Sequence, residues 1–156
     1  MRWRFAALIG TVVLATSCGG TPRLTIEGTL PTGDRLSITV VDQTGSVRAV
    51  LLAPAGSMSD AIGGLAIQPV VNDPHKILVT WVGRGCATAV TTSTVHVESK
   101  GARLSVRVRE PRTLQGCSSD VGEVKAVELV FNRDVPVGIV DGRREPDESS
   151  TLPAGS

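Results

Sequence analysis

Short segments in which apolar and polar residues alternate constrain the fold of this 156-residue chain more than any other feature. The clearest is residues 103–109, where Leu104, Val106 and Val108 alternate with arginine and serine. A period of two places successive side chains on opposite faces of a β-strand, so one face is buried and the other meets solvent. Similar segments, alternating or rich in apolar residues, occupy residues 24–27, 35–42, 47–52, 77–82, 94–98 and 125–131.

Turn-forming residues separate these segments, and no long helical period competes with them. Glycine, proline, asparagine and aspartate cluster between the segments, as in residues 31–34 and 72–74. Roughly seven to nine short strands predict an all-β domain over residues 24–142, built as a single antiparallel β-sandwich with immunoglobulin-like architecture. The topology stays open, because Trp81 precedes both candidate disulfide cysteines, whereas immunoglobulin domains place a tryptophan between them.

The N-terminus has the anatomy of an export signal over residues 1–17. Arginines precede an apolar run of about a dozen residues, and small residues follow it. The run is shorter than the roughly 20 residues that a membrane-spanning helix needs, so cleavage is the better interpretation. Cys18 comes next, and Ala15-Thr16-Ser17-Cys18 resembles the lipobox of bacterial lipoproteins, with Ala15 where leucine is usual. The alternative is an ordinary secretory signal that leaves Cys18 as an incidental thiol.

The lipobox resemblance implies that Cys18 carries a diacylglyceryl group and becomes the first residue of the mature chain. Two acyl chains hold a protein stably on a membrane, since each buried methylene contributes about 0.8 kcal/mol. The predicted linker, residues 18–23, is short, because five extended residues span at most about 17 Å. We therefore expect an exported domain anchored at the outer face of the cell membrane, with the lipid bilayer as partner through the acyl chains on Cys18.

If Cys18 carries lipid, the remaining two cysteines form a natural pair. Cys86 and Cys117 would lie in an oxidising compartment, where disulfides form and persist. A bridge closing this loop would stabilise the fold by roughly 3–4 kcal/mol in the chain-entropy model. The alternative is two unpaired buried thiols. The sequence therefore predicts one disulfide in the β domain.

Charge and aromatic content argue against several function classes. Without Arg2 and Arg4, the 16 basic residues become 14 against 15 acidic ones, and this near-neutral balance disfavours nucleic acid as a partner. Beyond the leader the only aromatic residues are Trp81 and Phe131, too few for a stacking platform that would hold sugars or bases. No metal-ligand spacing or phosphate loop is present in the sequence, so we expect no cofactor and no metal site.

The chain has two histidines, which are the candidates for the base of a catalytic triad. His75 falls in a predicted turn and His96 at a polar position of a predicted strand. Either could join a Ser-His-Asp site, but no serine lies in a Gly-x-Ser-x-Gly elbow. We assign no catalytic residue, and a small hydrolase using His75 or His96 stays an alternative.

Two further features bear on partners. One face of a predicted strand carries three arginines, Arg103, Arg107 and Arg109, and this face could contact anionic lipid or a protein. The alternative is a solvated face on which acids such as Glu98 or Glu128 lie between the arginines. Residues 143–156 are poor in apolar side chains, which predicts a disordered tail.

With its lipobox, Trp81-x-Gly83-x-Gly85-Cys86 and the later Gly116-Cys117, the chain resembles small uncharacterised lipoproteins of GC-rich bacteria. That resemblance implies an exported, membrane-tethered domain and brings no activity with it. The function we predict is a non-catalytic binding or accessory module of the cell envelope, with a possible envelope protein as partner. The alternatives are the hydrolase and a structural component of an envelope complex.

Overall fold

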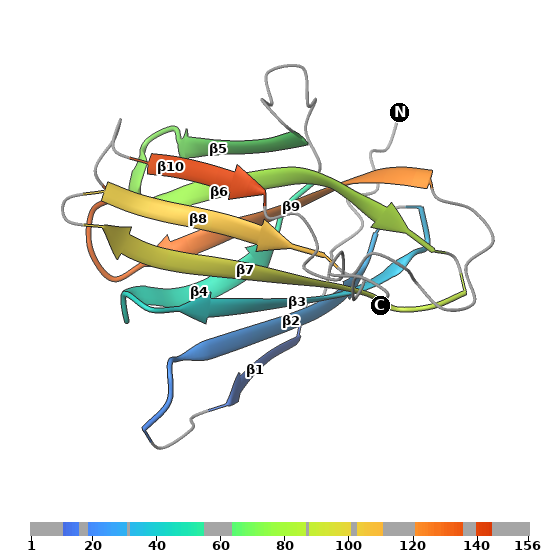
Figure 1. Ribbon diagram of the computed structural model, residues 1–156, viewed down its shortest axis with the longest axis horizontal. Helices are drawn as coiled ribbons and strands as arrows, with labels where there is room; N and C mark the ends of the chain where they lie inside the picture. Colours follow the sequence, from blue (N-terminus) through green and yellow to red (C-terminus); the bar gives the residue numbers. More distant parts are fainter. Residues whose placement is uncertain are drawn as a thin grey trace, which may run out of the picture.

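The computed structural model describes residues 11–15, 19–30, 32–54, 64–86, 88–100, 103–110, 121–135 and 140–144, which form ten β-strands and no α-helix. None of these segments is a helix long and apolar enough to cross a bilayer. The strands, labelled in Figure 1, are β1 (Thr11–Ala15), β2 (Arg23–Thr29), β3 (Arg35–Asp42), β4 (Val47–Leu52), β5 (Leu65–Val70), β6 (Asp73–Gly85), β7 (Thr91–Lys100), β8 (Arg103–Arg109), β9 (Val121–Phe131) and β10 (Val140–Arg144).

Within the described ranges, these strands form two sheets. One has six strands in the order β1-β2-β3-β7-β8-β10, and the other has four in the order β4-β9-β6-β5. In Figure 1, β9 of the four-stranded sheet passes behind β8 of the six-stranded sheet. The prediction of an all-β fold is therefore confirmed.

The predicted antiparallel arrangement is correct for the four-stranded sheet but wrong for the six-stranded one. There β3 pairs parallel with β7, and β10 pairs parallel with β8. After β3 the chain crosses to the other sheet, forms β4, β5 and β6 there, and only then returns as β7. A parallel neighbour requires such a long crossover, and the alternation of residues along one strand carries no information about the direction of the next.

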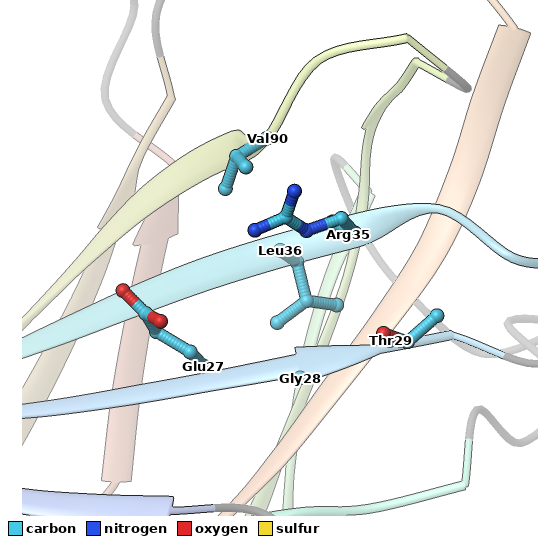
Figure 2. Close-up of a pocket in the computed structure, with 6 residues that line it drawn as sticks. All are labelled: Glu27, Gly28, Thr29, Arg35, Leu36 and Val90. Atoms are coloured by element: carbon cyan, nitrogen blue, oxygen red, sulfur yellow. The ribbon is translucent and has the colours of Figure 1, made fainter.

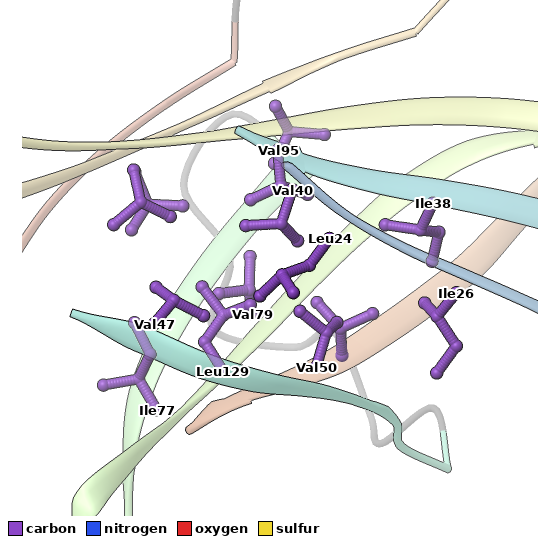
Figure 3. Close-up of a cluster of buried hydrophobic side chains, with 14 of the residues drawn as sticks. Leu24, Ile26, Ile38, Val40, Val47, Val50, Ile77, Val79, Val95 and Leu129 are labelled. Carbon is purple, nitrogen blue, oxygen red and sulfur yellow. The ribbon is translucent and has the colours of Figure 1, made fainter. Parts of the chain in front are cut away.

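The core consists of apolar side chains from alternate positions of both sheets. Figure 3 shows this cluster, in which side chains of β2, β3 and β7 meet side chains of β4, β6 and β9. The alternation predicted for residues 103–109 is confirmed, because Leu104, Val106 and Val108 are all buried. The fully buried members include Ile38, Val40, Ile77, Val79, Val95, Val97, Val127 and Leu129.

Several boundaries differ from the predicted ones. β6 begins at Asp73, inside the predicted turn, and β9 begins at Val121, four residues before the predicted segment. β5 contains Pro69 and was not predicted; it lies at the edge of its sheet, where a missing backbone donor is tolerated. β10 extends to Arg144, two residues into the predicted tail, because its backbone pairs with β8. Residues 145–156 lie outside the described part of the chain.

The first strand falls within residues predicted to be cleaved. β1 pairs antiparallel with β2 over its whole length, from Thr11 opposite Glu27 to Ala15 opposite Arg23. The remaining leader residues and Cys18 itself lie outside the described residues. In the chain as described, an apolar segment of the predicted leader thus occupies the edge of the six-stranded sheet.

The turn that carries the chain from one sheet to the other is built on Asp42. The side chain of Asp42 is fully buried, and its Oδ1 accepts hydrogen bonds from the backbone N of Thr44 at 2.9 Å and from Thr44 Oγ1 at 2.6 Å. Its Oδ2 accepts from the backbone N of Val47 at 2.7 Å. Gly45 in this turn has φ +64, a conformation that favours glycine. Asp42 thereby satisfies one backbone donor within the turn and another at the start of β4.

Candidate functional site

A pocket of about 230 Å³ lies at one end of the β2–β3 pair, where β7 begins. Figure 2 shows the residues that line it, with the guanidinium of Arg35 drawn between Val90 and Leu36 and the carboxylate of Glu27 to one side. Glu27, Arg35 and Val90 are exposed, whereas Leu36 is buried and forms part of the core. The pocket therefore combines one acidic and one basic group with an apolar floor. Gly28 and Thr29 complete its lining.

The register of β2 and β3 explains why these residues meet. Gly28 is opposite Leu36 and Thr29 is opposite Arg35. A Cβ at Gly28 would come within 2.1 Å of Leu52 Cδ1, so the glycine leaves room for a side chain of β4 in the other sheet. The two sheets thus approach each other closely at Gly28, which also lines the pocket. Such a site can hold a small ligand or a peptide segment that offers both charge and apolar contact.

A second candidate is a buried polar cluster around Glu110, which follows β8. One carboxylate oxygen, Oε1, accepts hydrogen bonds from Trp81 Nε1 at 2.8 Å, Ser93 Oγ at 2.8 Å and Lys125 Nζ at 2.9 Å. The other, Oε2, accepts from the backbone N of Arg84 at 3.1 Å. The side chains of Lys125 and Glu110 are only 1% and 7% exposed. A carboxylate with four donors, one of them a buried cation, is fully satisfied inside the protein.

The electrostatics of this cluster keep Glu110 ionised. Burial, the largest single influence, raises the pKa of Glu110, but the charge of Lys125 and the hydrogen bonds from Trp81, Lys125 and Ser93 together bring it below its usual value. Trp81 and Lys125 belong to the four-stranded sheet, and Ser93 belongs to the six-stranded one. Glu110 therefore links the two sheets through its hydrogen bonds. Because the Glu110–Lys125 pair is shielded from solvent, it is poorly placed to meet a substrate.

Close contacts explain both glycines of the motif that follows Trp81, and the first of them lies against the cluster. A Cβ at Gly83 would lie 2.2 Å from Glu110 Oε1, so only glycine leaves room for the carboxylate. At Gly85 a Cβ would lie 2.8 Å from Glu123 Oε2 and 3.1 Å from Asp34 Oδ2. Sequence reasoning missed Glu110 and Lys125. A signal existed for the lysine, which occupies the core-facing parity of β9 shared by Val127, Leu129 and Phe131.

The histidines do not come together and do not line the pocket. His75 lies on β6, where its backbone N donates to Asp73 Oδ1 at 3.1 Å and its Nε2 lies 3.3 Å from Oδ1 of the exposed Asp134. His96 lies on β7 in the other sheet, opposite Arg107 of β8 and Val41 of β3. Within the described residues, no group of three or more His, Cys, Asp or Glu side chains could hold a metal ion.

The structure describes all three arginines of the predicted basic face on β8. Arg107 forms an ion pair with Glu98, which confirms the interleaved acid for that arginine. Arg103 is exposed at the start of β8, and Arg109 lies opposite Thr94.

Cys86 follows β6 directly and is 5% exposed, with its Sγ 3.4 Å from Thr88 Oγ1. Cys18 and Cys117 lie outside the described residues, so the lipid site and the disulfide stay predictions.

Comparison with known proteins adds no relative: no protein-family model, no curated protein and no solved structure matches this chain. The function must therefore be inferred from the residues and their arrangement.

Proposed function

We propose that this chain is a membrane-tethered lipoprotein of the cell envelope that acts as a non-catalytic binding or accessory module. In this proposal Cys18 is lipidated, the two sheets form a β-sandwich, and a Cys86–Cys117 disulfide fastens one end of it. The pocket between Glu27 and Arg35 is the observation that carries the binding role, because an exposed acid, an exposed base and the exposed apolar Val90 surround one cavity.

The position of the pocket suits a tethered module. β2 begins at Arg23, five residues after Cys18, and the pocket lies at the far end of the same strand around Thr29. At the rise of a β-strand, this places the pocket about 20 Å along β2 from the end of the linker. Within one copy, the pocket and the attachment point would therefore lie at opposite ends of β2.

The arrangement of the titratable groups gives less support to a hydrolase. A nucleophile and its base need to lie within hydrogen-bond reach of each other beside a cavity. His75 and His96 lie on different sheets, and neither lines the pocket. The buried Glu110–Lys125 pair is shielded from substrate. A binding module requires none of these groups to react.

The tether is tested by replacing Cys18 in the full chain. The native protein is expected in the membrane fraction, with an intact mass that corresponds to a diacylglyceryl group and the loss of residues 1–17. Cys18→Ser should abolish both the lipid mass and the cleavage before residue 18, because the thioether cannot form. Thr21→Ser, a conservative change three residues away, should leave both unchanged. A soluble native protein that lacks the lipid mass would refute the tether.

The binding role is tested at the pocket itself. A photoreactive amino acid in place of Val90, in the tethered protein on its own membrane, should give a discrete adduct that is reduced several-fold by Arg35→Ala. The same label in place of Val71, which is 83% exposed on the turn before β6, should give no such adduct. A Val90 adduct that Arg35→Ala leaves unchanged would remove the pocket from the proposed function.

A further inference from the structure

Cleavage of the leader would change the edge of the six-stranded sheet. β1 covers the outer edge of β2 through the pairing of residues 11–15 with residues 23–27, and all of β1 lies in the leader. Within the described part of the chain, no other strand pairs with that edge, since the second neighbour of β2 is β3. An edge with unpaired backbone N–H and C=O groups is a template for another strand. The mature chain therefore has an available edge along β2.

The sequence of this edge is complementary to itself in the antiparallel direction. If Thr25 of one copy lies opposite Thr25 of another, Arg23 lies opposite Glu27, and the reverse pair forms at the same time. Arg23 and Glu27 are exposed, whereas Leu24 and Ile26 on the opposite face are buried. The core-facing pairs would be Leu24 with Ile26. Opposite charges placed directly across an antiparallel pair stabilise it.

We propose that mature copies of this chain form a symmetric dimer through antiparallel pairing of β2 with β2. The proposal rests on the proposed cleavage before Cys18. β1 shows that this edge accepts an antiparallel strand, and its Val13 occupies the position opposite Thr25 that the second copy would take. The same patch meets itself across a two-fold axis, which is the commonest arrangement of soluble homodimers. The leader then delays dimer formation until export is complete.

Attachment to the membrane favours the pairing of β2 with β2. The two-fold axis that relates two antiparallel strands of one sheet runs perpendicular to the sheet, so both linkers lie at the same level and both lipids can enter one bilayer. Anchored copies share a thin layer of space, which raises their effective concentration in the way a short linker does. The pairing would also place Arg23 of the partner subunit beside Glu27, a residue that lines the pocket.

Charge reversal tests the register directly. Arg23→Glu places two glutamates opposite each other at both ends of the pairing, and Glu27→Arg places two arginines there. Each single change should weaken the dimer about tenfold, from two altered cross-strand pairs. The double variant Arg23→Glu/Glu27→Arg restores opposite charges and should return dimerisation close to the native level. Arg103→Glu, at an exposed position of β8 in the same sheet, serves as the control and should have no effect.

Cysteine crosslinking provides the second readout, in the full chain exported to its own membrane. Thr25→Cys should give a disulfide-linked dimer, since Thr25 faces its own copy. Thr29→Cys should not, because the two copies of this residue would lie about 26 Å apart along the strands. A crosslink at Thr29, or a double variant as weak as the single ones, would overturn the register. A Thr25→Cys crosslink to a different protein would assign the edge to another partner.

Intact mass separates this proposal from the one on which it rests. A protein that keeps residues 1–17 shows that cleavage fails, and then the proposed function fails together with the dimer. A protein that begins at a lipidated Cys18, yet gives no Thr25→Cys dimer and no response to charge reversal, overturns the dimer alone.

Discussion

Replacing Glu110 by glutamine is expected to lower the free energy of unfolding by about 3–5 kcal/mol, the usual cost of removing one partner of a buried ion pair. The side chain of Lys125 is 1% exposed, and the carboxylate of Glu110 is the anion that this cluster provides for it at 2.9 Å. Glutamine can still accept from Trp81 and Ser93, but it carries no charge. Urea unfolding measures the loss. Glu98→Gln is the control, because the Glu98–Arg107 pair is partly exposed and should change stability by about 1 kcal/mol or less.

A second substitution identifies the origin of that cost. If the stranded ammonium is responsible, Lys125→Met in the Glu110→Gln background should recover a large part of the lost stability, because apolar replacements of buried pairs are often neutral. The coupling between the two changes follows from a double-mutant cycle. Strict additivity of the two losses would show that Lys125 and Glu110 do not act as a pair.

Acid provides an independent readout of Glu110. Because its pKa in the folded protein is lower than the ordinary value of 4.5, the folded state holds its proton less tightly than the unfolded state does. Its contribution to stability is therefore complete above pH 4.5 and is lost progressively as the pH falls from there through the folded pKa. Stability measured below pH 4.5 should decline more steeply in the native protein than in Glu110→Gln. Parallel curves would contradict an ionised Glu110.

Much of the strand structure could be predicted because it depends on local alternation. Leu36, Ile38 and Val40 on β3 point into the core, and so do the apolar residues of β8, as the period of two requires. β5 was missed because Pro69 and Gln68 interrupt its pattern, and an edge strand tolerates this interruption. The direction of neighbouring strands could not be predicted from the alternation, because the parallel β3–β7 pair depends on where the chain crosses between the sheets.

The candidate sites depended on contacts between distant parts of the chain. Glu110 looks like a loop residue in the sequence, and its partners Trp81 and Lys125 are 29 and 15 residues away. Lys125 interrupts an apolar parity, which indicates a buried cation but does not identify its anion. The pocket likewise depends on the register of β2 against β3 and on the start of β7.

Gly83→Ala is expected to destabilise the protein by about 2–4 kcal/mol, because the added methyl group overlaps the Glu110 carboxylate and displaces it from its donors. The nearer oxygen of this carboxylate lies 2.2 Å from the new Cβ. A freely moving side chain would relieve such a clash at little cost in stability, but this one is held by hydrogen bonds from Trp81, Ser93 and Lys125. Gly122→Ala is the matched control, since its Cβ would come no nearer than 3.3 Å to Val82 Cγ1.

Unfolding followed by Trp81 fluorescence reports on the same cluster, since the other tryptophan, Trp3, lies in the predicted leader. Gly83→Ala should shift the emission of Trp81, whose indole N–H loses its acceptor, whereas Gly122→Ala should not. In the Glu110→Gln background, Gly83→Ala should cost less than it does in the native protein, because both changes act through one side chain. Equal losses from the two glycine variants would mean that the carboxylate can leave without cost, and the motif after Trp81 would then need a different explanation.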